Sequence, residues 1–256
     1  MKHNNQINTL MFDLFGVLFK FDTIPAIRYL GPLDIIWYYI RFRQNPFERS
    51  LLILDKIRRE VPGEYQSLMK YRDIYLPESF VKWQKGEIQR GDLVHIVRSY
   101  IHKLTKEDYF VNHKDRLAIE RLLMLFAHPK QMQSSFYLPM YIFDLIKKIK
   151  ELNRYKLIII SNIDEETYNI VTQKYDYFFE LFDGFVASCK VNLVKPEPAI
   201  FNYAFKKYHV DPTQAMYIDD QKENIAAAQQ LGLTTHLCPR PKKLKSILEP
   251  IIDSEI

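Results

Sequence analysis

Polar side chains with complementary chemistry stand at four places in this sequence, each next to an apolar run. Asp13, Ser161 and the pair Asp219-Asp220 come directly after such a run or at its end, and Lys195 lies between a valine and a proline. A carboxylate can act as a nucleophile, a hydroxyl and an ammonium group can bind anionic oxygens, and two adjacent carboxylates can hold Mg²⁺. Together these groups suit an attack on a phosphorus or carbon centre.

The apolar runs indicate how these side chains are brought together. Runs such as Leu157–Ile160 are continuous and β-branched, which is typical of parallel strands covered on both faces. Ligands of such sheets bind outside the carboxyl ends of the strands. We therefore expect Asp13, Ser161 and Asp219-Asp220 at one edge of a sheet, with Lys195 reaching it from a loop.

Each residue also has an ordinary structural interpretation. An Asp after a strand is often a turn residue, most lysines in loops are exposed, and the stretch Ser161-Asn162-Ile163-Asp164 can begin a helix with Asp164 as its N-cap. Asp219-Asp220 could form an exposed turn. A buried pair, however, would repel unless a cation lay between the carboxylates, and this favours a Mg²⁺ site.

The spacing of apolar residues divides the chain into an α/β part and a helical part. Strands are expected at 10–14, 156–160, 184–187, 215–218 and 234–237, with helices at 141–152, 165–174, 198–208 and 223–231. This alternation predicts an α/β fold with a doubly wound parallel sheet, formed by residues 1–19 and 138–256.

Residues 20–137 show a different pattern. Apolar residues recur at helical spacing, with breaks at prolines and glycines, and helices are expected at 24–42, 50–57, 65–71, 93–104 and 117–126. This pattern predicts an enlarged, all-helical cap inserted after the first strand.

Composition narrows the class of partner. The chain has 256 residues, is 47% hydrophobic and carries a net charge of +5 that is spread along its length. We expect no nucleic-acid partner, and the positive charge suits an anionic substrate. The first ten residues are polar, Ile35–Ile40 is too short to span a bilayer, and there are only two cysteines. These features predict no conventional export signal, no membrane partner and a cytoplasmic location with reduced thiols.

The segment around Lys195 is the most specific of the four. It runs from Ser188 to Pro198 as Ser-Cys-Lys-Val-Asn-Leu-Val-Lys-Pro-Glu-Pro. Asn192 tolerates a left-handed turn, and Pro198 suits the first turn of a helix. An exposed loop lysine would not account for this whole setting.

In this order, the four segments resemble the motifs of the haloacid dehalogenase (HAD) superfamily. The resemblance is to its helical-cap phosphatases, among them sugar-phosphate phosphatases and the N-terminal phosphatases of epoxide hydrolases. Residues Trp83 to Ile88 are similar to the Gly-Glu-Ile signature of these caps. The resemblance covers 10–18 and 138–239, and it implies the HAD α/β core.

The resemblance implies a role for each site residue. Asp13, Ser161 and Lys195 would be catalytic, with Asp13 as the nucleophile that forms an aspartyl-phosphate. The Ser161 hydroxyl, the Asn162 backbone N–H and Lys195 would bind the phosphate of a small phosphorylated substrate. Mg²⁺ would be held by Asp13, the backbone carbonyl of Phe15 and Asp220, with Asp219 as a ligand through water.

Phe15 departs from the family pattern. HAD phosphatases usually carry a second Asp at this position, which protonates the leaving group and activates water, a contribution of about 10² to 10⁴ in rate. Three alternatives follow, in this order: a slower Mg²⁺-dependent phosphatase, a catalytically silent binding protein, and a dehalogenase-type hydrolase. The acidic pair disfavours the third. The aromatic cap cluster Trp37, Tyr38, Tyr39 and Phe42 would suit a protein partner, with core packing as the alternative.

Overall fold

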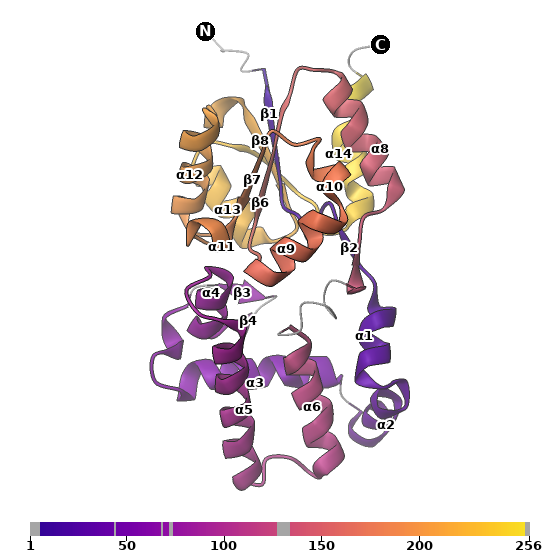
Figure 1. Ribbon diagram of the computed structural model, residues 1–256, viewed down its shortest axis with the longest axis vertical. Coiled ribbons are helices and arrows are strands. Elements are labelled where there is room, and N and C mark those ends of the chain that lie inside the picture. Colours follow the sequence, from indigo (N-terminus) through magenta and orange to yellow (C-terminus); the bar gives the residue numbers. More distant parts are fainter. Residues whose placement is uncertain (1–5, 44, 68, 72–73, 127–133, 254–256) are drawn as a thin grey trace. The chain divides into compact units, whose positions relative to one another are not determined.

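The computed structural model describes residues 6–43, 45–67, 69–71, 74–126 and 134–253 (Figure 1). The chain forms two compact units, Met1–Phe21 with Phe136–Ile256, and Asp22–Ser135. We call them the core unit and the cap unit. The cap unit is two residues shorter at each end than the expected range of 20–137. The reason is that Lys20–Phe21 and Phe136–Tyr137 pair as the antiparallel strands β2 and β5 of the core unit.

The core unit contains the predicted parallel sheet. Its strands have the order β7-β6-β1-β8-β9, and every neighbouring pair is parallel. The strands are β1 (Thr9–Phe12), β6 (Lys156–Ser161), β7 (Gly184–Ala187), β8 (Ala215–Asp219) and β9 (Thr234–Leu237). All residues of β1 and β8 are buried, as expected for strands covered on both faces. The predicted fold class is confirmed.

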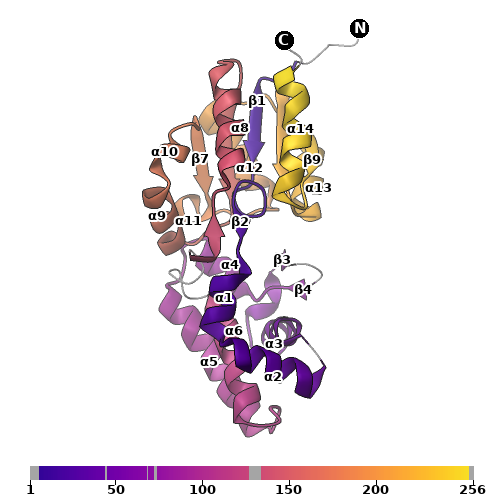
Figure 2. The same ribbon diagram turned by 90° about the vertical axis from the view of Figure 1, so that its right-hand side faces the viewer.

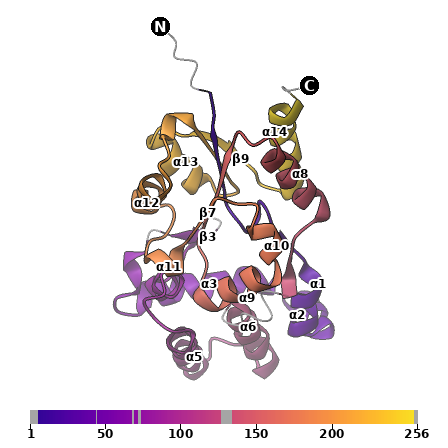
Figure 3. The same ribbon diagram turned by 45° about the horizontal axis from the view of Figure 1, so that its top comes forward.

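Helices cover both faces of the sheet (Figures 1 and 3). Met11, Ile158 and Tyr217 pack with α12 (Pro198–Tyr208) and α13 (Lys222–Gln230). Their neighbours Phe12 and Ile159 pack with α8 (Met140–Glu151) and α14 (Pro241–Asp253). This division follows from the alternation of side chains along a strand. The helices are α8 (Met140–Glu151), α9 (Glu165–Lys174), α10 (Asp176–Phe179), α11 (Ser188–Val191), α12 (Pro198–Tyr208), α13 (Lys222–Gln230) and α14 (Pro241–Asp253), with a 3₁₀ turn at Pro212–Gln214.

The cap unit is mainly helical. Its helices are α1 (Thr23–Leu30), α2 (Pro32–Phe42), α3 (Pro46–Glu60), α4 (Glu78–Gln84), α5 (Arg90–Lys106) and α6 (His113–Phe126). The single helix expected at 24–42 is two helices, because Gly31 has a φ of 90° and Pro32 starts a new helix.

The prediction of a helix at 65–71 is wrong. The structure has a 3₁₀ turn at Glu64–Gln66 and a two-stranded ribbon of β3 (Lys70–Tyr71) and β4 (Ile74–Tyr75). Seven residues are too few for apolar spacing to distinguish a helix from other structure. The cap is therefore not all-helical. Within the described ranges, no helix combines the length and apolar content needed to cross a membrane.

Candidate active site

Three strands of the core unit deliver polar side chains to one edge of the sheet. Phe12, the last residue of β1, pairs with Ile159 of β6 and Ile218 of β8. Asp13 follows directly, and its backbone N–H donates to the Ile218 carbonyl at 2.9 Å. Asp13 therefore lies level with Asp219, the last residue of β8. The polar side chains therefore lie together at the carboxyl edge of the sheet, as predicted.

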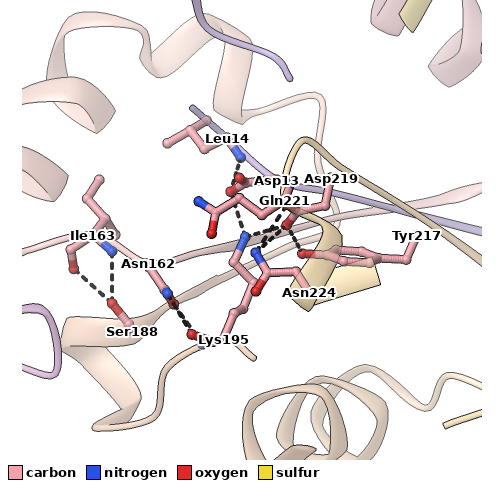
Figure 4. A network of polar contacts seen from close by, with 10 residues as sticks. All are labelled: Asp13, Leu14, Asn162, Ile163, Ser188, Lys195, Tyr217, Asp219, Gln221 and Asn224. Atoms are coloured by element: carbon pink, nitrogen blue, oxygen red, sulfur yellow. Dashed lines mark hydrogen bonds and ion pairs between the residues drawn. The ribbon is translucent and has the colours of Figure 1, made fainter. Parts of the chain in front are cut away.

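Lys195 joins this edge from the loop after α11 (Figure 4). Its Nζ lies 2.7 Å from Oδ1 of Asp13 and 2.9 Å from Oδ2 of Asp219. The side chain is only 2% exposed. The loop has the predicted form, with Asn192 in the left-handed region at a φ of 56° and Pro198 at the start of α12. Lys195 is thus a buried ammonium group between two carboxylates.

Asp219 is fully buried, and protein donors occupy both of its oxygens. Gln221 N–H donates to Oδ1 at 2.7 Å, and Asn224 Nδ2 lies 3.1 and 3.0 Å from the two oxygens. The hydroxyl of Tyr217 donates to Oδ2, which also accepts from Lys195. With these donors in place, Asp219 is held in one position and has little capacity for a further direct ligand.

Asp220 has the opposite character. Its Oδ1 is buried and has no hydrogen-bond partner within the described part of the chain. Its Oδ2 lies so close to Gly16 that a Cβ atom there would approach to 2.4 Å. Gly16 also has a φ of 91°, so two separate features require glycine at this position.

Asp13, Asp219 and Asp220 can place one oxygen each within 4.8 Å of one another. Three oxygen ligands, one of them buried and without a partner in the described part of the chain, fit a hard divalent cation such as Mg²⁺. Burial raises the pKa of Asp13 to about 8, opposed by Lys195 and reinforced by Asp219 and Asp220. Burial, followed by the charge of Asp219, raises the pKa of Asp220 to about 6. A bound cation would favour the ionised form of both groups.

Lys195 responds in the direction expected of a paired cation. Burial alone favours its neutral amine, but the charges of Asp13 and Asp219 outweigh burial and raise the pKa of Lys195. The ammonium group therefore stays charged at neutral pH and balances part of the negative charge at this edge.

Ser161 and Asn162 end β6 and begin the next loop, and they differ in their contacts. Ser161 is 1% exposed, and its hydroxyl makes no hydrogen bond to another described residue. The Asn162 side chain is fully engaged with the backbone of Lys195: Nδ2 donates to the carbonyl at 2.9 Å, and Oδ1 accepts from the N–H at 2.8 Å. Asn162 thus positions Lys195, a role that was not predicted from the sequence.

A second pair of hydrogen bonds joins the loop after β6 to the start of α11, the helix that precedes the Lys195 loop. The Ser188 hydroxyl accepts from the Ile163 N–H at 2.8 Å and donates to the Ile163 carbonyl at 3.1 Å. The contacts of Ser188 and Tyr217 were also missed. For Tyr217 a signal existed, since it lies two residues before Asp219 and so on the same face of the strand. The predicted N-cap is confirmed, because Asp164 accepts from Thr167 N–H.

Phe15 is part of an aromatic cluster. Its ring centroid lies 4.2 Å from that of Phe136 and 6.2 Å from that of Phe19, and Phe136 in turn contacts Phe21 at 5.2 Å. Phe21 and Phe136 belong to the β2–β5 ribbon. Phe15 therefore anchors the loop after Asp13 to this ribbon by packing, and it contributes no titratable group.

Comparison with protein families supports these observations. The family model for haloacid dehalogenase-like hydrolases matches residues 7–232. Mouse bifunctional epoxide hydrolase 2 is 34% identical over 56 residues, which are 22% of this chain and 10% of that protein. A sesquiterpene phosphatase of Aspergillus oryzae is 32% identical over 57 residues, 22% of this chain and 29% of that protein. The chain therefore matches less than a third of the length of either relative.

Solved structures share the fold over nearly the whole chain. An HAD family enzyme of Bacteroides thetaiotaomicron is 21% identical, covers 91% of this chain with 93% of its own, and gives a TM-score of 0.56. Its complex with magnesium and inorganic phosphate is 19% identical, covers 90% and 93% of the two chains and gives 0.54. A dehalogenase with an intermediate complex is 14% identical, covers 95% and 97%, and gives 0.55.

Proposed function

This chain belongs to the haloacid dehalogenase-like hydrolase family, and from this premise we propose that it is a Mg²⁺-dependent phosphatase of a small phosphorylated metabolite. The observation that carries the proposal is the buried Oδ1 of Asp220, which has no partner among the described residues and lies beside the Asp13–Lys195–Asp219 network. A dehalogenase has no need of a cation site. A metal-assisted attack on a phosphate ester does need one.

Asp13 supplies the nucleophile. One of its oxygens forms a bond to phosphorus while the bond from phosphorus to the leaving alcohol oxygen breaks, which leaves an aspartyl-phosphate. Water then attacks phosphorus, the bond to Asp13 breaks, and phosphate is released with the carboxylate restored. Oδ1 of Asp13 accepts from the Leu14 N–H at 2.7 Å and from Lys195, so the carboxylate is held in one orientation.

Lys195, Ser161 and the Asn162 backbone N–H bind the phosphoryl oxygens in this proposal. The Ser161 hydroxyl is without a protein partner among the described residues, so it can donate to substrate. Lys195 is held on its backbone by Asn162 and on its ammonium group by two carboxylates, which limits its motion. A fixed positive charge stabilises the transition state without reorganisation.

Asp13, Asp220 and the backbone carbonyl of Phe15 would hold Mg²⁺, which supplies positive charge to the phosphoryl oxygens and lets the substrate approach the carboxylates. The occupied oxygens of Asp219 support its assignment as a ligand through water. The magnesium and phosphate complex of the Bacteroides neighbour and the phosphatase among the relatives support the same reaction class.

Phe15 favours a second candidate, a catalytically silent protein that binds phosphate. Phe15 stands at the sequence position where phosphatases of the family usually carry the general acid, and its ring packs on Phe136, so no side chain at that position delivers a proton. If the protein is a phosphatase, the oxygen of the leaving alcohol must take its proton from water. The phosphatase is then slow, and it prefers leaving groups that need little protonation.

One set of assays separates the two candidates. Wild type and Asp13→Asn, purified identically, are tested with Mg²⁺ on an aryl phosphate, a panel of sugar phosphates and nucleotides. We expect wild-type turnover that exceeds the variant by about 10³-fold or more and disappears with EDTA. Phe15→Asp should increase the rate on alkyl phosphates, by at most about 10² to 10⁴-fold. Equal rates for wild type and Asp13→Asn would favour the silent protein.

A further inference from the structure

Tyr217 is a buried residue beside the site that the proposed reaction does not use. It belongs to β8 and comes two residues before Asp219, so both side chains lie on the same face of the strand. On this face the Tyr217 ring packs edge-on against Phe201 of α12, with the ring centroids 5.2 Å apart. Helix α12 covers the face of the sheet opposite α8 (Figure 2). Tyr217 is fully buried in this layer, so the position of its hydroxyl is fixed.

Core packing accounts for the ring of Tyr217 but not for its hydroxyl. A phenylalanine would fill the same space, and a buried hydroxyl is unfavourable unless it is hydrogen-bonded. The hydroxyl donates to Oδ2 of Asp219 (Figure 4). Without this donor, both Asp219 oxygens would still have partners. Oδ1 accepts from Gln221 N–H and Asn224 Nδ2, and Oδ2 accepts from Asn224 Nδ2 and Lys195 Nζ.

The shared oxygen connects Tyr217 to Lys195. Oδ2 of Asp219 lies 2.9 Å from Lys195 Nζ, and Nζ lies 5.9 Å from the centroid of the Tyr217 ring. Because the Tyr217 hydroxyl offsets part of the negative charge of Oδ2, it weakens the attraction of this oxygen for the ammonium group. An ammonium group has three N–H donors, and within the described part of the chain Lys195 uses two, for Asp13 and Asp219.

We propose that Tyr217 is a positioning residue of the phosphate site, whose hydroxyl limits the attraction between Asp219 and Lys195 and so keeps the ammonium group available to a phosphoryl oxygen. This inference rests on the proposed function, because it takes phosphate as the ligand of Lys195. It holds for a phosphatase and for a silent protein that binds phosphate. In Tyr217→Phe, Asp219 holds Lys195 more tightly, and phosphate is bound less well.

Calorimetry of the full chain with inorganic phosphate, at saturating Mg²⁺, tests this role. For Tyr217→Phe we expect the Kd of phosphate to rise about three- to tenfold, which is less than the direct loss of a hydrogen bond to a charged group would cause. Tyr208→Phe is the matched control. The Tyr208 hydroxyl lies in the same apolar cluster but accepts from the Phe185 backbone N–H at 3.2 Å, so its removal should leave the Kd of phosphate unchanged.

The affinity for Mg²⁺ separates the positioning of Lys195 from a general disturbance of the site. Asp13 and Asp220 are the direct ligands in the proposed function, and the Tyr217 hydroxyl donates instead to Asp219. Tyr217→Phe should therefore bind Mg²⁺ no more weakly than wild type, measured by calorimetry without phosphate. Urea unfolding of both tyrosine variants measures the stability that each hydroxyl adds.

Three results would overturn this inference and leave the proposed function intact. Tyr217→Phe could bind phosphate as tightly as wild type. Tyr208→Phe could weaken phosphate binding to the same extent, which would show that the loss follows stability alone. The Kd of Mg²⁺ could rise in parallel with that of phosphate, which would assign the hydroxyl to the arrangement of the carboxylates. Wild type that binds no phosphate with Mg²⁺ would instead overturn the proposed function and this inference together.

Discussion

The core unit and the cap unit each contain a buried ion network, and the two differ in one respect. In the cap, Asp115 is fully buried and accepts from Arg49 Nη1 at 2.8 Å and from the Val111 N–H at 3.0 Å, so both of its oxygens have donors. Arg49 also donates to Tyr38 and to the Tyr109 carbonyl. In the core, Asp220 keeps a buried oxygen without a partner among the described residues.

This difference separates a structural network from a functional one. Burying a charged group lowers the stability of the fold unless the group is paired and hydrogen-bonded. A network in which every group is paired offsets this desolvation and also holds together the elements that it joins. Arg49 and Asp115 join α3 to the start of α6, and both carboxylate oxygens of Asp115 have donors among the described residues. The core network brings three carboxylates together, and one of them, Asp220, keeps an oxygen without a partner among the described residues. This arrangement is unfavourable for folding alone and suits a cation.

The largest effect is expected from replacing Lys195, whose ammonium group is the positive charge of the core network. Lys195→Met leaves Asp13 and Asp219 buried without their shared partner, so the free energy of unfolding should fall by about 3 to 5 kcal/mol without Mg²⁺. Activity on an aryl phosphate should fall by about 10³-fold, because the phosphoryl group loses a fixed positive charge. Urea unfolding and initial rates check the two parts. A fully active variant would exclude Lys195 from the site.

Replacing Arg49, the positive charge of the cap network, should lower the free energy of unfolding by a similar amount but leave the chemistry of the core unit intact. Arg49→Met leaves the carboxylate of Asp115 buried and unpaired, so we expect a loss of about 3 to 5 kcal/mol in urea unfolding. Mg²⁺ binding by calorimetry should be unchanged. Arg49→Met with Asp115→Leu should recover most of the loss, since no unpaired charge remains. A double variant no more stable than the single one would mean that packing, not charge, is the cause.

Mg²⁺ itself should stabilise the core by mass action. At a concentration 100 times its Kd, a ligand that binds only the folded state adds about 2.7 kcal/mol. Asp220→Ala should remove this gain and the calorimetric signal, while Asp115→Asn, in the other network, should keep the gain. Thermal unfolding with and without Mg²⁺ measures both. An unchanged Mg²⁺ effect in Asp220→Ala would place the cation elsewhere.

The core side of this contrast was predicted from the sequence, whereas the cap network of Arg49 and Asp115 was not. The β-branched run before Ser161 and the setting of Lys195 between Asn192 and Pro198 predicted the sheet edge and the loop correctly. The break at Gly31 was missed because helical spacing continues on both sides of it. The hydrogen bonds between Asn162 and Lys195 join residues that are 33 positions apart in the sequence, and no local sequence pattern predicts such a contact.

The smallest effect is expected from a third network, which is exposed and fully paired. Lys56, Tyr100 and Lys103 donate to Glu60 at 2.7, 2.6 and 2.9 Å and lower its pKa from 4.5 to about 2. A carboxylate with a lowered pKa adds stability above its unfolded pKa, and this contribution is lost as the pH falls from about 4.5 toward about 2. The side chain is 34% exposed, so solvent screening limits the contribution to about 1 kcal/mol or less.

Glu60→Gln isolates this contribution. The difference in the free energy of unfolding between wild type and Glu60→Gln should be constant from pH 7 to 5 and should shrink as the pH is lowered to 3, measured by urea unfolding at each pH. Salt should reduce it throughout, because exposed pairs are screened. If the difference instead grew on acidification, the carboxylate would be bound better in its protonated form, and the three donors would not set its pKa. A pH-independent difference would show that Glu60 stabilises the cap through packing of its side chain, in contrast to the charge-dependent networks of Arg49 and Lys195.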